Sequence, residues 1–180
     1  MQNEKYKFVI LDWSKMNQFA KDFMQIYNEA WSHHEDFKPL TMEAVMKRLK
    51  QIKPVLDPNF AIFAYAEGRP IGFYISMLEV NQVFKNFNGK LNLWNKLKFL
   101  MNRSKINKVR GIIFGVVPDF QNLGIETGMI MKFHEGYTNS PNIKVAELAW
   151  IGDFNGKMLS MLKSLGSYTT KVHYTYRKIF

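Results

Sequence analysis

One segment of the sequence could hold a phosphate group. Residues 115–128 read GVVPDFQNLGIETG, in which an apolar run ends at a proline and a glycine-containing turn opens an amphipathic pattern. Backbone N–H groups at the start of a helix converge on an anion, and the helix dipole adds a partial positive charge there. Such a diphosphate loop would consist of Gln121, Asn122, Leu123, Gly124, Ile125 and Glu126. An ordinary strand-to-helix turn is the alternative, and this short motif alone is a weak signal between the two.

Glu126 brings a negative charge into this turn. A glutamate in the first turn of a helix is stabilising by about 0.3–1 kcal/mol through the helix dipole. Its carboxylate would also compete with a bound diphosphate. Either the side chain points to solvent and only its N–H matters, or anion binding is weakened.

Other side chains could move protons. Glu147 lies in an apolar run, 144–151, and a carboxylate can act as a general base directly or through one water. An equal alternative is a strand residue paired with a lysine. Four side chains of the alternating tail are candidate general acids, although the alternation fits a packed strand face better. These are Tyr168, His173, Tyr174 and Tyr176.

Metal and thiolate chemistry find little support in the sequence. The polar stretch HHED, residues 33–36, has adjacent histidines with no partner at chelating distance along the chain, so we expect no metal. The chain has no cysteine, which excludes disulfides, thiolate ligands and a cysteine nucleophile. Any covalent catalysis would therefore need another residue.

Composition points to one globular domain. The chain has 180 residues, of which 47% are hydrophobic and 15% aromatic. No apolar run reaches membrane-spanning length, and the N-terminal apolar segment is too short for a signal peptide, so we expect a soluble cytoplasmic protein. The net charge of +10 is concentrated between 84 and 110, a range with eight basic residues and no acid. A local basic patch indicates an anionic partner.

The elements that would position these residues follow from periodicity. Alternating or continuous apolar runs predict strands at 6–13, 109–117, 144–151 and 167–180 and a hairpin over 59–80. Helical spacing predicts helices at 15–31, 41–52, 93–101, 125–137 and 155–165. The order is β-α-α-β-β, a helical insert at roughly 81–107, then β-α-β-α-β. We predict a single mixed α/β domain spanning 1–180.

This order, with VVPDFQNLGIE at its centre, resembles the GNAT superfamily of acyltransferases. The shared features are a V-x-P-like strand end, a Q-x-x-G-x loop, and an asparagine after the next strand followed by a helix ending in Leu-Gly. Asn28 and Trp31, as N-x-x-W, and W-I-x-x-x-N from Trp150 to Asn155 are similar to a group of uncharacterised bacterial GNAT-like proteins. The resemblance implies a mostly antiparallel sheet with helices on both faces. Some of these relatives are about twice as long.

The resemblance also implies roles for particular residues. Acetyl-CoA or another acyl-CoA would be the co-substrate, with no metal, and its pantetheine arm would pair with the backbone of Val116 and Val117 and be oriented by Asn155. Two family features are missing. The central strand carries no carboxylate, with Arg110 near its expected place, and Leu162 falls where a tyrosine often protonates the departing thiolate. Glu147 as base and Tyr168 as acid are the substitutes.

The insert has three interpretations. It could be a lid packed on the domain through the stripe Leu93, Trp94, Leu97, Leu100 and Met101, with a solvated basic face. It could bind an anionic acceptor or the 3′-phosphate of CoA. It could lie on an acidic membrane surface or on RNA. We favour the lid and consider nucleic acid the weakest partner, because few aromatic residues are interleaved with the charges.

Our leading functional hypothesis is an N-acyltransferase that passes an acyl group from acyl-CoA directly to an amine. No covalent intermediate is required, which agrees with the missing cysteine. The acceptor would be a small molecule or a peptide. The alternatives are a catalytically silent binding module on the same fold and a basic protein that binds RNA or a membrane surface.

Overall fold

The computed structural model describes residues 5–33, 37–148 and 150–178. It consists of two compact units, Met1–Ala149 and Trp150–Phe180. The first unit contains all the strands and the helices α1 to α5, and the second contains α6. A single domain over the whole chain stays a prediction.

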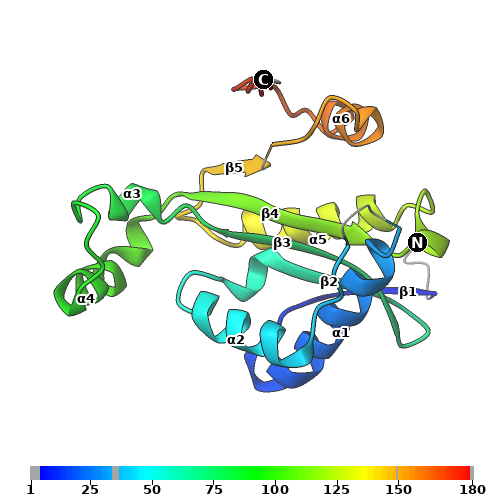
Figure 1. Cartoon of the computed structure of the whole chain (residues 1–180), viewed down its shortest axis with the longest axis horizontal. Coiled ribbons are helices and arrows are strands. Elements are labelled where there is room, and N and C mark those ends of the chain that lie inside the picture. Colours follow the sequence, from blue (N-terminus) through cyan, green and yellow to red (C-terminus); the bar gives the residue numbers. More distant parts are fainter. Residues whose placement is uncertain (1–4, 34–36, 149, 179–180) are drawn as a thin grey trace. The chain divides into compact units, whose positions relative to one another are not determined.

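The first unit is built on a five-stranded sheet in the order β1-β2-β3-β4-β5. Neighbouring strands are antiparallel from β1 to β4, and β5 joins β4 in parallel after a crossover through α5 (Figure 1). The strands are β1 Tyr6–Ile10, β2 Ala61–Ala66, β3 Arg69–Leu78, β4 Lys108–Val116 and β5 Val145–Leu148. The predicted strands at 6–13, 109–117 and 144–151 and the hairpin are therefore confirmed, with β5 shorter than expected.

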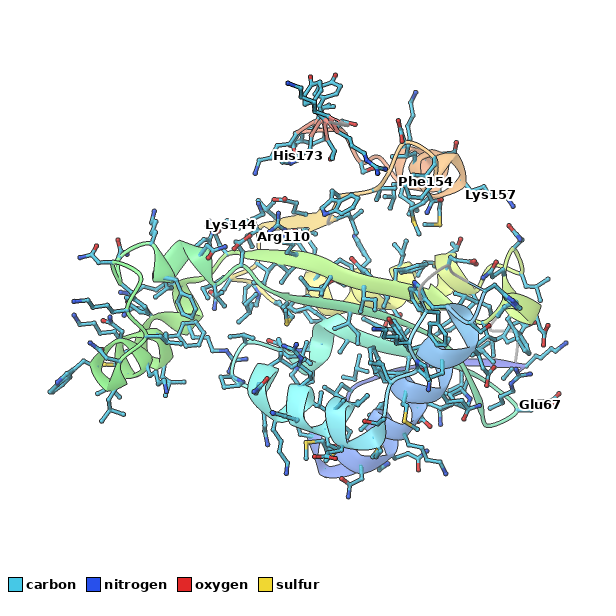
Figure 2. The ribbon with its side chains drawn as sticks, in the orientation of Figure 1. Glu67, Arg110, Lys144, Phe154, Lys157 and His173 are labelled. Carbon is cyan, nitrogen blue, oxygen red and sulfur yellow. The ribbon has the colours of Figure 1, made fainter. Side chains whose placement is uncertain are left out.

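The turn of the β2–β3 hairpin consists of Glu67, which is labelled in Figure 2, and Gly68. Their φ angles are +50° and +85°. Two central residues with positive φ match the right-handed twist of the flanking strands, and this fixes the register of the pair.

Helices cover both faces of the sheet, as the resemblance to the GNAT superfamily implied. On one face α1 (Met16–Ala30) packs against β3 and β4, and α2 (Met42–Ile52) packs on α1. On the other face α5 (Ile125–Thr138) packs against β1, β2 and β3. Thr41 caps α2 by accepting a hydrogen bond from the Ala44 N–H, as its predicted N-cap role requires.

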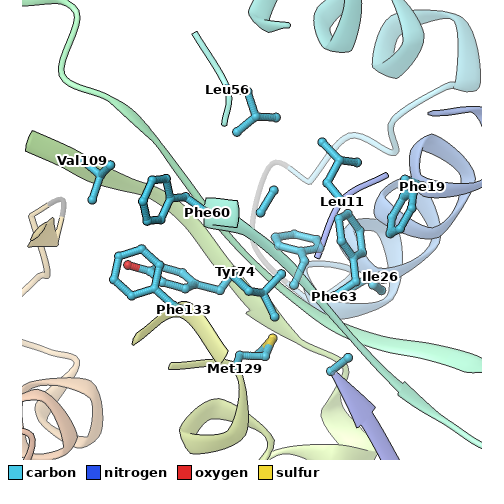
Figure 3. Close-up of a cluster of buried hydrophobic side chains, with 14 of the residues drawn as sticks. Leu11, Phe19, Ile26, Leu56, Phe60, Phe63, Tyr74, Val109, Met129 and Phe133 are labelled. Carbon is cyan, nitrogen blue, oxygen red and sulfur yellow. The ribbon is translucent and has the colours of Figure 1, made fainter. Parts of the chain in front are cut away.

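Consecutive residues of β3 show how the core divides between the two faces, because side chains alternate along a strand. Phe73 stacks on Phe23 of α1, with ring centroids 4.6 Å apart. Tyr74 contacts Phe133 of α5 edge to face at 5.1 Å. Figure 3 labels core residues of both groups: Phe63 near Phe19 and Ile26 of α1, and Tyr74 near Met129 and Phe133 of α5. Short 3-10 turns complete the unit at η1 Trp13–Lys15, η2 Pro58–Phe60, η3 Arg103–Lys105 and η4 Pro118–Phe120.

The insert between β3 and β4 forms α3 (Asn81–Phe84) and α4 (Leu93–Asn102). One residue of α4, Phe99, is buried, and its ring meets that of Phe84 at 5.3 Å. The apolar stripe predicted to pack on the domain is exposed instead, with Leu93 83% and Trp94 73% accessible. The lid interpretation is therefore wrong, because a single buried phenylalanine on the opposite face anchors the helix.

The second unit contains α6 (Gly156–Ser164), whose predicted end is confirmed by Gly166 with φ +82°. The strand predicted at 167–180 is wrong over its described part, since residues 167–178 form no regular element, and residues 179–180 lie outside the described ranges. Alternation alone does not make a strand, because its N–H and C=O groups need a neighbouring strand.

Candidate functional site

One edge of β4 is paired with β5 over only part of its length. Among the described residues, β5 accompanies β4 only from Lys108 to Gly111, and beyond that point the ladder of β4 runs with β3 alone. The register to β3 shifts at the same place, so that Ile112 is an extra residue between two paired ones. A bulge bends the strand that carries it. The bulge therefore lies where β4 parts from β5.

In the second half of β4, the backbone N–H and C=O groups of every second residue face this unpaired edge. The Val117 N–H donates to the Ile71 carbonyl oxygen of β3 at 2.9 Å. Successive residues of a strand direct their N–H and C=O to opposite edges. The groups of Val116 and Phe114 consequently face away from β3, toward the edge that β5 has left.

The resemblance implied that the backbone of Val116 and Val117 pairs with the pantetheine arm. Val116 faces the edge, whereas Val117 uses its N–H on Ile71 and its carbonyl oxygen on the Phe120 N–H at 3.0 Å. Phe114, two residues before Val116, faces the same edge as Val116. The cofactor-binding roles of Val116 and Val117 stay predictions.

Gln121 fixes the start of the loop. Its side-chain Nε2 donates to the Val116 carbonyl oxygen at 3.0 Å. The first residue of the Q-x-x-G motif thus ties the loop to the end of β4. The next turn contains Asn122 with φ +62° and the largely exposed Leu123.

Gly124 is the N-cap of α5, with φ +83°. A Cβ there would meet no atom within 4 Å, so the requirement for glycine comes from the backbone angle and not from crowding. No side chain of the described residues caps this helix. The first N–H groups of a helix have no partner within it. Those of Ile125, Glu126 and Thr127 are therefore available to an acceptor, and a diphosphate fits this donor set.

Acidic side chains lie in and beside the loop. Glu126 is in the first turn of α5 and is partly exposed. Asp119 is 3.9 Å from Arg69 Nη1, and Arg69 also binds Glu29 at 2.8 Å. The Arg69 guanidinium lies over the Phe120 ring, 5.5 Å from its centroid. Arg69 thereby anchors the η4 turn to the hairpin and to α1, and its charge is shared between two carboxylates.

Glu147, the candidate base, is paired with cations on β4. It lies opposite Arg110 in the parallel register and forms ion pairs with Lys108 and with Arg110, whose Nη2 is 3.2 Å from Oε1. Figure 2 shows Arg110 at this end of β4, beside β5. The side chain of Glu147 is 17% exposed. To take a proton from an amine, the carboxylate would have to leave one of its cations.

Arg110 also approaches Glu79 at 3.9 Å, at the end of β3. Both carboxylates therefore belong to one charged cluster that joins β3, β4 and β5. The alternative reading of Glu147, a strand residue paired with a lysine, describes this geometry.

The N-x-x-W pair near the end of α1 has a structural explanation. Asn28 accepts from the Leu40 N–H at 2.8 Å and donates to the Leu40 carbonyl oxygen at 3.1 Å, which ties the start of α2 to α1. Trp31 lies against Gly115 of β4, where an added Cβ would be 2.5 Å from two ring carbons. The pair positions α1 on the strand that carries the candidate site.

The second unit carries the remaining candidates. Asn155 is the N-cap of α6, and its Oδ1 accepts from the Met158 N–H at 3.2 Å. Leu162, at the position where the family often has a tyrosine, is a buried residue of α6. Tyr168 follows α6 in the segment without regular structure. The roles of Asn155 and Tyr168 stay predictions.

The described residues contain no cluster of three or more potential metal ligands. Of the HHED stretch, residues 34–36 lie outside the described ranges. Within the described part of the chain, no helix has the length and apolar character needed to cross a membrane.

Comparison with solved structures identifies the fold. An aminoglycoside acetyltransferase from an uncultured soil metagenomic sample, in complex with trehalose, superposes with a TM-score of 0.63 at 15% identity, over 98% of this chain and 99% of that one. The aminoglycoside N-acetyltransferase AAC(6')-Iy, in complex with the bisubstrate analogue CoA-S-monomethyl-acetylneamine, gives 0.62 at 17% identity, over 97% and 99%. A GNAT family acetyltransferase from Staphylococcus aureus gives 0.55 at 14% identity, over 97% and 99%. The chain has the GNAT fold.

Sequence comparison adds a relative of another kind. A bacterial ceramide synthase from Caulobacter vibrioides is 25% identical over 175 residues, which cover 93% of this chain and 45% of that protein. The chain thus spans about half the length of this curated relative. No protein-family model matches the sequence. Within the GNAT fold, the loop after β4 and the unpaired edge of β4 are the features identified above as the candidate site.

Proposed function

We propose that the protein is an acyl-CoA-dependent N-acyltransferase. The observation that carries the proposal is the pairing of two features on one strand of a GNAT fold. The second half of β4 presents the backbone of Phe114 and the N–H of Val116 at an edge that no described residue of β5 accompanies, and the loop after it leads into the start of α5, which no described side chain caps. A thioester arm and its diphosphate need these two kinds of donor in this order along the chain.

In the proposed reaction the free amine of the acceptor attacks the thioester carbonyl carbon. The N–C bond forms, the C–S bond breaks, and CoA leaves as a thiolate that takes up a proton. The N–H of Phe114 would polarise the carbonyl oxygen, and the N–H groups at the start of α5 would bind the diphosphate. The roles of Glu147 as the base that takes the proton of the amine and of Tyr168 as the acid remain part of the proposal.

Two classes of acceptor belong in the assay. Aminoglycosides are the acceptors named for two of the structural neighbours. A ceramide is by definition the amide of a fatty acid with a long-chain amino alcohol, so the sequence relative indicates a lipid amine with a long-chain acyl-CoA. A purified protein should be assayed with acetyl-CoA and palmitoyl-CoA against both classes, by following the free thiol of released CoA.

Binding is tested by thermal unfolding with CoA and with pantetheine, which lacks the diphosphate. CoA at about a hundred times its Kd should raise Tm by about 5 to 10 °C, because it binds only the folded state. Pantetheine, which lacks both the diphosphate and the adenosine nucleotide, should raise Tm far less at the same concentration, and adding adenosine 3′-phosphate with it should not restore the shift if the loop of Gln121–Glu126 binds the diphosphate. No shift with CoA or acyl-CoA would contradict the proposal.

The role of Glu147 is tested against a neighbour in the same cluster. Glu147→Gln should lower kcat by about tenfold or more and leave the Kd for acyl-CoA unchanged if this carboxylate is the base. Glu79→Gln removes the other carboxylate that approaches Arg110 and is the control. An equal loss in both variants would assign Glu147 to the architecture of the sheet.

A non-catalytic binding module on the same fold is the second candidate, and the ion pairs of Glu147 favour it. Such a module would bind CoA in the thermal assay without releasing thiol from acyl-CoA in the presence of any amine. The two assays together distinguish an enzyme, a binding module and a protein that does neither.

A further inference from the structure

The helix α4 presents its apolar stripe outward. Figure 1 shows the insert of α3 and α4 extending past the end of the sheet, away from α1 and α2. Within the described chain, α4 makes its main contacts with α3 and η3 only. Four of the stripe's side chains are more than half exposed: Leu93 at 83%, Trp94 at 73%, Met101 at 71% and Leu100 at 58%.

The stripe is a regular face of a well-defined helix. Successive residues of an α-helix are turned by about 100°, so positions 93, 94, 97, 100 and 101 fall within a sector of about 120°. Phe99 lies on the other side and is the buried anchor. Asn92 caps the helix by accepting from the Asn95 N–H at 2.9 Å, and Asn95 donates to the Lys90 carbonyl oxygen at 2.7 Å. The apolar face therefore points to solvent, because the opposite face of the helix packs on the protein through Phe99.

Cations border the stripe on both sides. On the helix, Lys96 and Lys98 fall at the two margins of the apolar sector. None of the basic residues from 85 to 105 forms an ion pair with another described residue. They are Lys85, Lys90, Lys96, Lys98, Arg103 and Lys105.

We propose that α4 is a membrane-surface anchor that lies on an anionic phospholipid bilayer. Leu93, Trp94 and Leu97 would enter the boundary between headgroups and acyl chains, and the flanking lysines would meet lipid phosphates. An anionic bilayer offers negative charge at its headgroups and an apolar layer beneath them. The lysines of α4 match the charge, and its apolar stripe matches the apolar layer. Tryptophan, with an apolar ring and an N–H donor, favours this interface.

Other occupants match the surface less well. A second copy of the chain would bring a second set of unpaired cations against the first, which is repulsive. RNA would satisfy the lysines with phosphates but would leave most of the apolar stripe without a partner. A helix of ten residues is about 15 Å long, so the proposed attachment is peripheral and reversible. The inference does not depend on the proposed enzymatic activity.

The test is vesicle flotation of the full chain with phosphatidylcholine alone or with about one third phosphatidylglycerol added. The protein should float with the anionic vesicles and not with the neutral ones. Lys96→Glu/Lys98→Glu should weaken the association by more than about tenfold. Lys47→Glu/Lys50→Glu on α2 makes the same change in net charge and should weaken it much less.

Leu93→Gln/Trp94→Gln should weaken association by about tenfold, because two apolar side chains no longer enter the interface. Met131→Gln, an exposed apolar residue of α5, is the control and should have little effect. Unchanged Tm in all variants shows that the fold is intact, as expected for exposed positions.

Several results would overturn the proposal. They are equal flotation with neutral and anionic vesicles, equal loss with the α2 control pair, or no effect of Leu93→Gln/Trp94→Gln. A dimer in sedimentation that the same variant dissolves, without flotation of the wild type, would assign the stripe to a second copy. Tight retention on RNA without vesicle binding would assign the basic patch to nucleic acid.

Discussion

Individual residues of the turn between β4 and α5 divide into those that hold the turn and those that leave donors exposed. Val117 uses both its N–H and its carbonyl oxygen within the protein, and Gln121 binds the Val116 carbonyl oxygen. Gly124 permits the left-handed step into α5. In this turn Gln121 and Gly124 thus hold the backbone in place, and the groups without a partner inside the helix are the backbone N–H groups at the start of α5.

Gly124→Ala tests the backbone requirement. Because φ is +83° and the space around the position is open, the cost comes from the left-handed conformation, about 1–2 kcal/mol of unfolding free energy. Urea unfolding measures it. Gly124→Asn is the matched variant, since asparagine tolerates this conformation, and should lose clearly less. Equal losses would mean that the position depends on something other than φ.

Glu126→Gln separates the stability of α5 from ligand binding. Removing the charge from the first turn should lower the free energy of unfolding by about 0.3–1 kcal/mol. The same change should tighten CoA binding severalfold if the carboxylate repels the diphosphate. Calorimetric titration gives the Kd. Glu43→Gln in the first turn of α2 is the control, with a similar loss of stability and an unchanged Kd. Weaker CoA binding by Glu126→Gln would show that the glutamate supports the site.

At the scale of elements, α1 is positioned on β4 by a stack of rings. Trp31 stacks on Tyr27 with centroids 4.9 Å apart and lies nearly parallel to Phe73, at an interplanar angle of 9°. Its indole occupies the space over Gly115. The glycine of the GVV sequence is therefore explained by close packing of a helix on the strand, one residue before the edge that Val116 presents.

Gly115→Ala should destabilise the protein by about 1–3 kcal/mol, because the indole cannot move without disturbing the stack. Trp31→Phe alone should also be destabilising, since it removes part of that stack. The double variant should lose less than the sum, by about 1 kcal/mol, because the smaller ring makes room for the new methyl group. Strict additivity of the three unfolding free energies would contradict the packing described here.

Elements with their own periodic pattern could be predicted from the sequence, and elements that depend on a distant partner could not. The apolar spacing in α1, α2 and α5 and the runs in β2 to β4 identify them correctly, because those patterns record which face is buried. The stripe of α4 has the same spacing, yet it is exposed, since a pattern does not tell which surface will cover it. The tail 167–178 alternates without forming a strand for the same reason.

The candidate site was predictable in part. The Q-x-x-G loop and its position after β4 follow from the sequence. The place of Phe114 depends on the direction of the Val117 N–H, and the ion pairs of Glu147 depend on the parallel register of β5. Both features depend on how the strands pair, and the spacing of residues along the chain does not reveal strand pairing.

For the first unit as a whole, the sheet buries a tyrosine whose hydroxyl responds to pH. Tyr74 is 3% exposed beneath α5, and burial raises its pKa to about 12. In the unfolded chain a tyrosine has a pKa of about 10. Burial also raises the pKa of Tyr65, whose hydroxyl donates to the buried Asp22 at 2.6 Å.

These shifts predict an alkaline loss of stability. Above pH 10 the unfolded state releases the tyrosine proton while the folded state keeps it, so the free energy of unfolding falls as pH rises from about 10 to 12. Tyr74→Phe removes this proton from both states. The free energy of unfolding of the variant should therefore rise relative to that of the wild type by about 2 kcal/mol between pH 10 and pH 12. Below pH 9 the difference between the two proteins should depend little on pH. Urea unfolding at a series of pH values measures the difference, in which the titration of lysines is common to both proteins. A difference that stays constant up to pH 12 would mean that the Tyr74 hydroxyl ionises as easily in the folded sheet as in water.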